Sequence, residues 1–127
     1  MKPRDSLVRL KSFQVNEKKR QRDQLAMMIE EFDRMVSDLT AQIETEERKA
    51  GINDPTHFAY PMPAKAAHTR RDKLQDSMRE LKVQLDAAKI ALEEAEAELD
   101  KAREKERRDG RVPVEEPVRV RKDAMIG

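Results

Sequence analysis

The sequence predicts an all-α protein, an antiparallel two-helix coiled-coil hairpin with a proline-rich tip and a flexible C-terminal tail. Of its 127 residues, 42% are charged and only 3% are aromatic, a composition that cannot fill an ordinary globular core. Apolar residues instead repeat with heptad spacing in two long segments, which a stretch containing glycine and prolines separates. We therefore expect one hairpin domain over residues 1–107, with helix one at about 5–50, the tip at 51–63, helix two at about 63–107 and the tail at 108–127.

The heptad repeat is the observation that excludes disorder. Apolar residues in the first segment are separated alternately by four and three positions, and the second segment continues the same alternation without a fault. A disordered charged chain would not keep this phase. The expected core positions are Leu25, Ile29, Phe32, Val36, Leu39 and Ile43 in helix one, and Leu74, Met78, Leu81, Leu85, Ala88, Leu92, Ala95 and Leu99 in helix two.

The positions of the two stripes favour a fold-back within one chain. Ile43 and Leu74 have residue numbers that add to 117, and so have five further pairs, the last of which is Leu25 with Leu92. Every such pair joins an a position to a d position, as antiparallel helices require. The fold-back would then be centred between Phe58 and Ala59. The alternative is a longer dimer, because the same heptads could also form a coiled coil between two chains.

Turn-forming residues lie between and after the two stripes. Gly51 can supply the left-handed residue that ends helix one, and Asp54 followed by Pro55 is typical of the start of a short helical turn. Pro61 and Pro63 then precede helix two, and we expect Gly110 to end that helix. The last residues contain two further prolines and alternating charges, which indicates a flexible tail.

Two parts of this hairpin are candidates for protein binding. With the pairing above, helix two ends before it can cover Leu7, Val8, Leu10 and Phe13, which lie close to a basic run. These residues either form a docking end, fray, or pack on a second copy. The predicted docking residues at this end are Leu7, Leu10, Phe13, Lys18, Lys19, Arg20 and Arg22.

The tip is the second candidate. The hairpin cannot bury all of its apolar side chains, so they either plug the end of the coiled coil or bind a partner. These residues are Ile52, Phe58, Tyr60 and Met62.

The sequence offers no sign of catalysis or of a cofactor. His57 and His68 have no third ligand spaced to join them in a metal site, and the chain lacks glycine-rich phosphate loops, a nucleophile elbow and a carboxylate pair in a pocket. We therefore expect no enzyme, no cofactor and no metal. The chain has no cysteine, and its longest apolar run, Leu25 to Ile29, is too short for a signal peptide or a membrane span, so we expect a cytoplasmic protein.

Nucleic-acid binding is a weaker possibility. Residues 1–24 hold eight basic and three acidic side chains, but they lack interleaved aromatic residues, and the helix turns acidic immediately afterwards. A coiled-coil adaptor or chaperone with a protein partner agrees better with this pattern.

Three stretches resemble a known family. LVRLKSFQVNEKKRQRDQLAMMIEEFDRM, GINDPTHFAYP and AKAAHTRRDKLQDS are similar to the flagellar export proteins called FliJ, in the form found in alphaproteobacteria. The resemblance covers roughly residues 5–105. The tip stretch is its distinctive part, because heptads occur in every coiled coil.

The resemblance implies a function that the periodicity does not. FliJ proteins are cytoplasmic components of the flagellar type III export apparatus, at the inner membrane beneath the flagellum. They form an antiparallel two-helix coiled coil, bind and stimulate the export ATPase, link it to the export gate, and assist export chaperones in flagellum assembly and hence in motility and chemotaxis. The resemblance implies that the end with Leu10 faces the ATPase and that the tip with Phe58 and Tyr60 faces the gate. Many members have a longer second helix than Gly110 and Pro113 indicate here.

Overall fold

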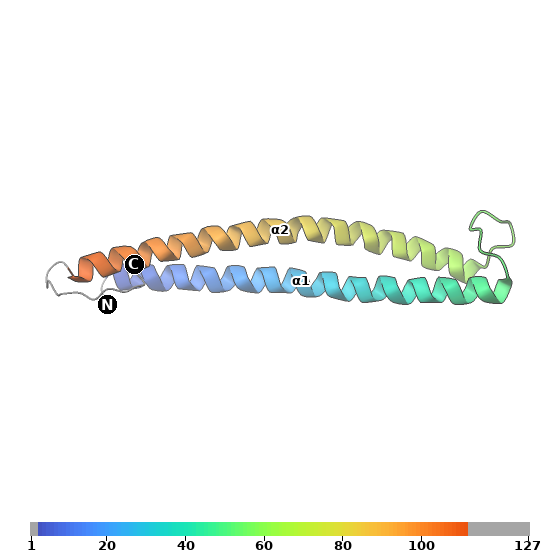
Figure 1. The fold of residues 1–127 in the computed structure, drawn as a ribbon, viewed down its shortest axis with the longest axis horizontal. Helices are drawn as coiled ribbons and strands as arrows, with labels where there is room; N and C mark the ends of the chain where they lie inside the picture. The colour runs from blue at the N-terminus through green and yellow to red at the C-terminus, as the bar shows by residue number, and fades with distance from the viewer. Residues whose placement is uncertain (1–2, 112–127) are drawn as a thin grey trace. The chain divides into compact units, whose positions relative to one another are not determined.

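The structure consists of two long helices joined by one loop. The computed structural model describes residues 3–111, in which α1 spans Pro3–Ala50 and α2 spans Met62–Arg111. The described residues contain no strand, so the all-α prediction is confirmed (Figure 1). Most of the predicted tail lies outside the described residues.

The chain divides into two compact units. The terminal unit comprises residues 1–19 and 90–127, and the tip unit comprises residues 20–89. In each unit, a segment of α1 and a segment of α2 lie side by side and run in opposite directions (Figure 1).

The tip unit has its core near the loop. Leu39, Ile43 and Ala67 form a buried cluster on which Leu74 packs. Met78 and Leu81 are buried farther along α2. Full burial of a side chain such as Ile43 contributes roughly 1.5–3 kcal/mol to stability. The remaining predicted core residues of this unit are only partly buried, as expected between just two helices: Leu25, Ile29, Phe32, Val36, Leu85 and Ala88.

The terminal unit has a core of its own. Val15, Leu92 and Leu99 form a buried cluster, and Val8 and Ala95 pack against it. The expectation that Val8 has no partner in its own chain is therefore wrong. Leu92 and Leu99 lie within the predicted helix two, so Val8 is covered because α2 pairs with α1 in a different register from the predicted one.

The pairing of the helices differs from the predicted one. The residue numbers of Thr40 and Arg71, whose side chains are hydrogen-bonded, add to 111, and those of the ion pair Lys11 and Glu98 add to 109. The predicted sum was 117, so the observed contacts are displaced by about one heptad within each unit. A displacement by a heptad again brings core positions opposite core positions, which is why the apolar pattern did not reveal it. Ala67, which the predicted stripe omitted, is buried and extends the apolar contact toward the loop.

The C-terminal ends of the two helices behave differently. Gly51 has φ of 71° and its N–H donates to the carbonyl of Glu47 at 2.8 Å, so it ends α1 in the left-handed conformation as predicted. Gly110, by contrast, does not end α2, which continues to Arg111 and so passes the expected end at residue 107. A single glycine costs a helix only about 1 kcal/mol, which neighbouring turns can offset.

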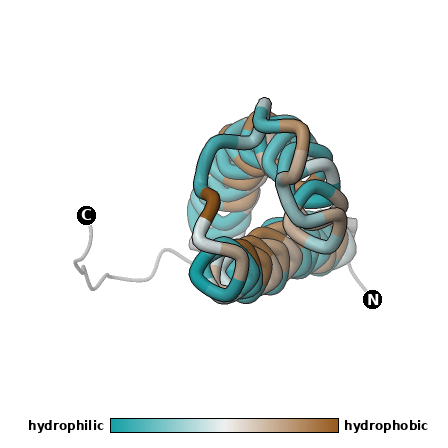
Figure 2. Tube along the Cα trace, turned by 90° about the vertical axis from the view of Figure 1, so that its right-hand side faces the viewer, coloured by the Kyte–Doolittle hydropathy of each residue, from teal (hydrophilic) through white to brown (hydrophobic). Residues whose placement is uncertain are grey.

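Hydrophilic and hydrophobic residues alternate along the helices (Figure 2), and no described helix has an apolar stretch long enough to cross a membrane.

Candidate protein-interaction surfaces

The loop between the helices begins with a turn at Asp54. The carboxylate Oδ1 of Asp54 accepts hydrogen bonds from the backbone N–H of Thr56 at 3.0 Å and from its hydroxyl at 2.8 Å. The N–H of His57 closes the turn by donating to the carbonyl of Asp54 at 3.0 Å. The bond from the Thr56 N–H, followed by that from its hydroxyl, lowers the pKa of Asp54. The predicted turn at Asp54 and Pro55 is present, but it is not continued as a helix.

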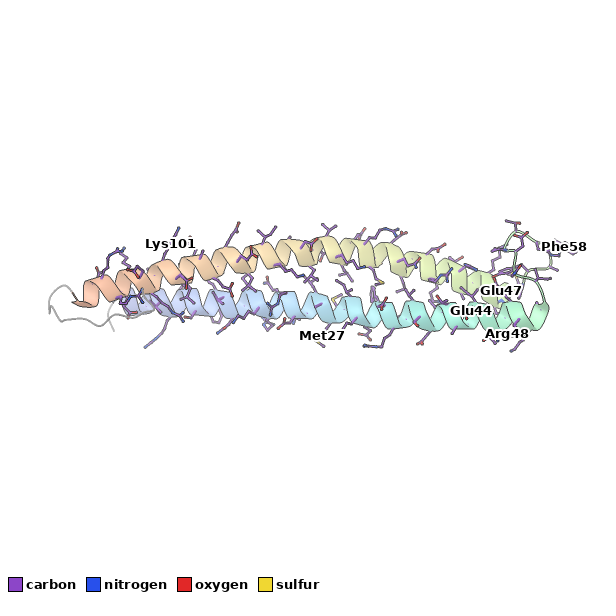
Figure 3. The ribbon with its side chains drawn as sticks, in the orientation of Figure 1. Met27, Glu44, Glu47, Arg48, Phe58 and Lys101 are labelled. Atoms are coloured by element: carbon purple, nitrogen blue, oxygen red, sulfur yellow. The ribbon has the colours of Figure 1, made fainter. Side chains whose placement is uncertain are left out.

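A second turn follows directly and exposes Phe58. The N–H of Tyr60 donates to the carbonyl of His57 at 3.0 Å, and the N–H of Ala59 donates to His57 Nδ1 at 2.9 Å. The His57 ring stacks on the Phe58 ring with 4.8 Å between their centroids. The Phe58 side chain is 97% exposed and projects outward from the loop (Figure 3).

Tyr60 turns back onto the helices. Its side chain is buried, with only 6% of the residue exposed, and its hydroxyl donates to Glu47 Oε2 at 2.6 Å. Burial, together with the hydrogen bond and the negative charge of Glu47, raises the pKa of Tyr60 to about 12. Of the two interpretations of the tip residues, Tyr60 therefore fits the one in which it plugs the end of the helix pair.

A chain of polar contacts continues from Tyr60 across α2. His68 Nε2 lies 3.1 Å from the Tyr60 oxygen, and His68 Nδ1 lies 3.2 Å from an Arg71 guanidinium nitrogen. Arginine has no acceptor, so Nδ1 accepts from Arg71 and the proton of neutral His68 is on Nε2. The other terminal nitrogen of Arg71 donates to Thr40 Oγ1 on α1 at 3.0 Å. These five residues, Glu47, Tyr60, His68, Arg71 and Thr40, are called the tip network below.

The tip network was not predicted from the sequence. One signal for it was available, because Arg71 occupies an a position of the heptad that continues back from Leu74. A polar residue at such a position often fixes which residues pair across a coiled coil. The partners Glu47 and Thr40 could not be identified without the correct pairing of the helices.

The exposed apolar residues of the tip are Phe58 and Met62, which are called the tip surface. Met62 is 73% exposed at the first residue of α2, whereas Ile52 is partly buried. Binding of a partner by this surface stays a prediction. Two further residues of α1 in the same unit, Met28 and Met35, are each a little over two-fifths exposed. Met27 is more exposed and points away from α2 (Figure 3).

The terminal unit has a second exposed apolar surface. Leu10 is 51% exposed and Phe13 is 66% exposed on α1, and these two residues are called the terminal surface. Leu7 is partly buried. Lys11, between the two exposed residues in sequence, forms an ion pair with Glu98 of α2 at 3.5 Å. The terminal surface therefore lies on a helix segment that is already held against α2.

The predicted basic docking residues are distributed over both units. Lys18 is partly buried and Lys19 is exposed in the terminal unit, whereas Arg20 and Arg22 belong to the tip unit. The Arg22 guanidinium contacts the neighbouring Asp23 carboxylate at 2.9 Å. Arg22 is thus partly neutralised within α1, which makes it a weaker candidate for partner binding than Lys19.

No group of three histidine or acidic side chains is placed to hold a metal ion among the residues the structure describes. His57 and His68 have separate roles, one in the loop turn and the other in the tip network.

No family model, curated protein or solved structure matches the chain. The resemblance to FliJ proteins therefore stays a prediction that depends on the three quoted stretches of sequence.

Proposed function

We propose that this chain is a FliJ-like coupling protein of the flagellar type III export apparatus. In this proposal it is a cytoplasmic, non-enzymatic coiled coil, peripheral to the inner membrane. It binds the export ATPase, promotes ATP hydrolysis, and connects the ATPase with the export gate and with export chaperones.

The observation that carries the proposal is the exposure of Leu10 and Phe13 within the first stretch that resembles the family. Both side chains are at least half exposed, although Val8 and Val15 on the same segment pack in the core of the terminal unit. The segment thus presents apolar side chains on one face while another face is held by α2. An apolar face supported in this way is suited to docking on a partner protein.

One expected departure from the family concerns the end of helix two. The sequence suggested a second helix that ends early, but α2 continues through Gly110 to Arg111. Both helices contribute to the terminal unit, in which Val15 of α1 packs with Leu92 and Leu99 of α2. The resemblance implies such a two-helix arrangement for the part that approaches the ATPase.

The test is ATP hydrolysis by the flagellar export ATPase of the same organism, titrated with this protein. We expect stimulation by the intact chain, and we expect Leu10→Asp with Phe13→Asp to abolish it, because an added carboxylate opposes burial of an apolar contact. Phe58→Ala is the matched control at the tip surface and should leave the stimulation intact. An active ATPase that does not respond to the intact chain would contradict the proposal and favour a coiled-coil adaptor with another partner.

A further inference from the structure

We propose that the tip network is a protonation-sensitive latch that holds the loop 51–61 against the helix pair. The inference depends only on the contacts within the tip unit and does not require the proposed export function. The latch is closed when His68 is neutral and opens when His68 takes up a proton.

The direction of the hydrogen bonds in the network is fixed by its two ends. Arg71 can only donate and the Glu47 carboxylate can only accept, so the bonds run from Arg71 to His68, from His68 to Tyr60 and from Tyr60 to Glu47. Each of the two middle residues, His68 and Tyr60, donates once and accepts once. This arrangement requires one unprotonated nitrogen on His68.

When His68 is protonated, its Nδ1 can no longer accept the hydrogen bond from Arg71. Nδ1 would then carry a hydrogen directed at an Arg71 N–H group 3.2 Å away, and two positive charges would be in contact. Arg71 has little freedom to retreat, because its other terminal nitrogen is bonded to Thr40 and its Nε is buried without a hydrogen-bond partner. The conflict is therefore relieved most easily by movement of His68, which breaks its bond to Tyr60.

The charged groups around His68 oppose one another. Arg71 of α2 disfavours the protonated ring, and Glu47 of α1 favours it through Tyr60 of the loop. On α2 itself, Lys65 and Asp72 are about one turn away on either side and have opposite charges. Of these charged groups, Arg71 is the one whose side chain contacts the His68 ring directly.

The latch controls the loop because Tyr60 is its anchor. Within the described loop, Tyr60 is the one residue that is buried, and Phe58 lies only two residues before it. When Tyr60 is released, the second turn loses its attachment to the helices, and Phe58 loses its fixed position. Presentation of the tip surface would then depend on pH.

Hydrogen exchange of the full chain tests the latch. Protection factors for the peptide covering the loop are compared at about pH 8 and about pH 5, the range in which imidazole side chains take up a proton. We expect protection of the loop to fall on the order of tenfold at the lower pH, the change that the loss of one hydrogen bond produces. Protection of the α1 segment around Leu39 should stay constant, which distinguishes opening of the latch from unfolding.

Two histidine variants identify the residue that responds. His68→Gln can keep one donor and one acceptor but takes up no proton, so its loop protection should be the same at both pH values. His57→Gln is the matched control, because His57 Nδ1 also accepts a hydrogen bond in the loop. It should retain the response of the intact chain. The latch is excluded if the intact loop shows equal protection at both pH values, or if His57→Gln removes the response and His68→Gln preserves it.

Discussion

The hydroxyl of Tyr60 lies 2.6 Å from Oε2 of Glu47, and this contact ties the loop to the last turn of α1. It joins two residues separated by thirteen positions in the sequence. The contact also explains why one of the few aromatic residues occurs in a loop, since Tyr60 combines an apolar ring that can be buried with a hydroxyl that satisfies a carboxylate.

The first prediction concerns the titration of Tyr60. Its pKa is raised to about 12 by burial and by Glu47, compared with 10.0 for a free tyrosine. The neutral phenol is therefore favoured in the folded state. The neutral phenol contributes fully to stability below pH 10.0, the pKa of tyrosine in the unfolded chain. This contribution is lost as the pH rises through about 12.

Absorbance of the phenolate measures this titration directly, because the chain has one tyrosine and no tryptophan. In Glu47→Gln, which removes the negative charge, the midpoint of the Tyr60 titration should move to lower pH. It should stay above the value of a free tyrosine, because the ring remains buried. Circular dichroism recorded in parallel verifies that the helices persist over the range. A midpoint of the intact folded chain at the free value would show that the phenol is not held by Glu47.

The second prediction contrasts two aromatic residues of the tip that are two positions apart. Phe58→Ala should change the free energy of unfolding by no more than about 0.5 kcal/mol, because the side chain is almost fully exposed. Tyr60→Phe should lower the melting temperature by several degrees, because it removes a donor to Glu47 and an acceptor for His68. Thermal unfolding followed by circular dichroism measures both. Equal melting temperatures for Tyr60→Phe and the intact chain would contradict the role of the hydroxyl.

The third prediction contrasts two glycines. An added Cβ meets open space at Gly51 and at Gly110, so only the backbone conformation distinguishes the two positions. Gly51→Ala should destabilise the protein by about 1 kcal/mol, because φ of 71° is strained for residues with a side chain. Gly110→Ala should stabilise α2 by about 0.5 kcal/mol, because alanine favours the helix.

Urea unfolding of the two glycine variants gives the free energies of unfolding for this comparison. Destabilisation by Gly110→Ala comparable to that of Gly51→Ala would mean that residue 110 does not have a helical backbone.

The fourth prediction concerns the core of the tip unit. Ile43→Ala should lower the free energy of unfolding by about 2–4 kcal/mol, because Ile43 is 4% exposed within a buried cluster. Met27→Ala is the control on the same helix and should have an effect below about 0.5 kcal/mol, because Met27 points away from α2 (Figure 3). Similar costs for the two substitutions would indicate that α1 packs through a different face.

The heptad pattern predicted the helices and the faces that pack, since Leu39, Ile43, Met78, Leu81, Leu92 and Leu99 are all buried. It did not predict which residues lie opposite one another. The apolar pattern is unchanged when one helix slides by seven residues, so a polar contact such as that between Thr40 and Arg71 is needed to define the pairing. The pattern also predicted too early an end for α2, because a single glycine costs a packed helix only about 1 kcal/mol and does not end it.

The candidate surfaces were predicted only in part. Leu10, Phe13, Phe58 and Met62 are exposed as a partner surface requires, whereas Tyr60 is buried. Composition alone could not separate Phe58 from Tyr60. The distinction arises from the hydroxyl of Tyr60 and from the position of Glu47 one turn before the end of α1, which is a tertiary relationship.

The central claim is that α1 and α2 of a single chain pack against each other in the pairing described above. The chain has no cysteine, so Lys11→Cys with Glu98→Cys introduces the only two thiols, at positions whose native side chains form an ion pair. Treatment of the dilute protein with a short bismaleimide should link these thiols within one chain, and the product should have the mass of a monomer. The control pair, Lys11→Cys with Glu106→Cys, has residue numbers that add to 117 and should react poorly. Preferential linkage of the control pair, or linkage of Lys11→Cys and Glu98→Cys only between two chains, would contradict the account.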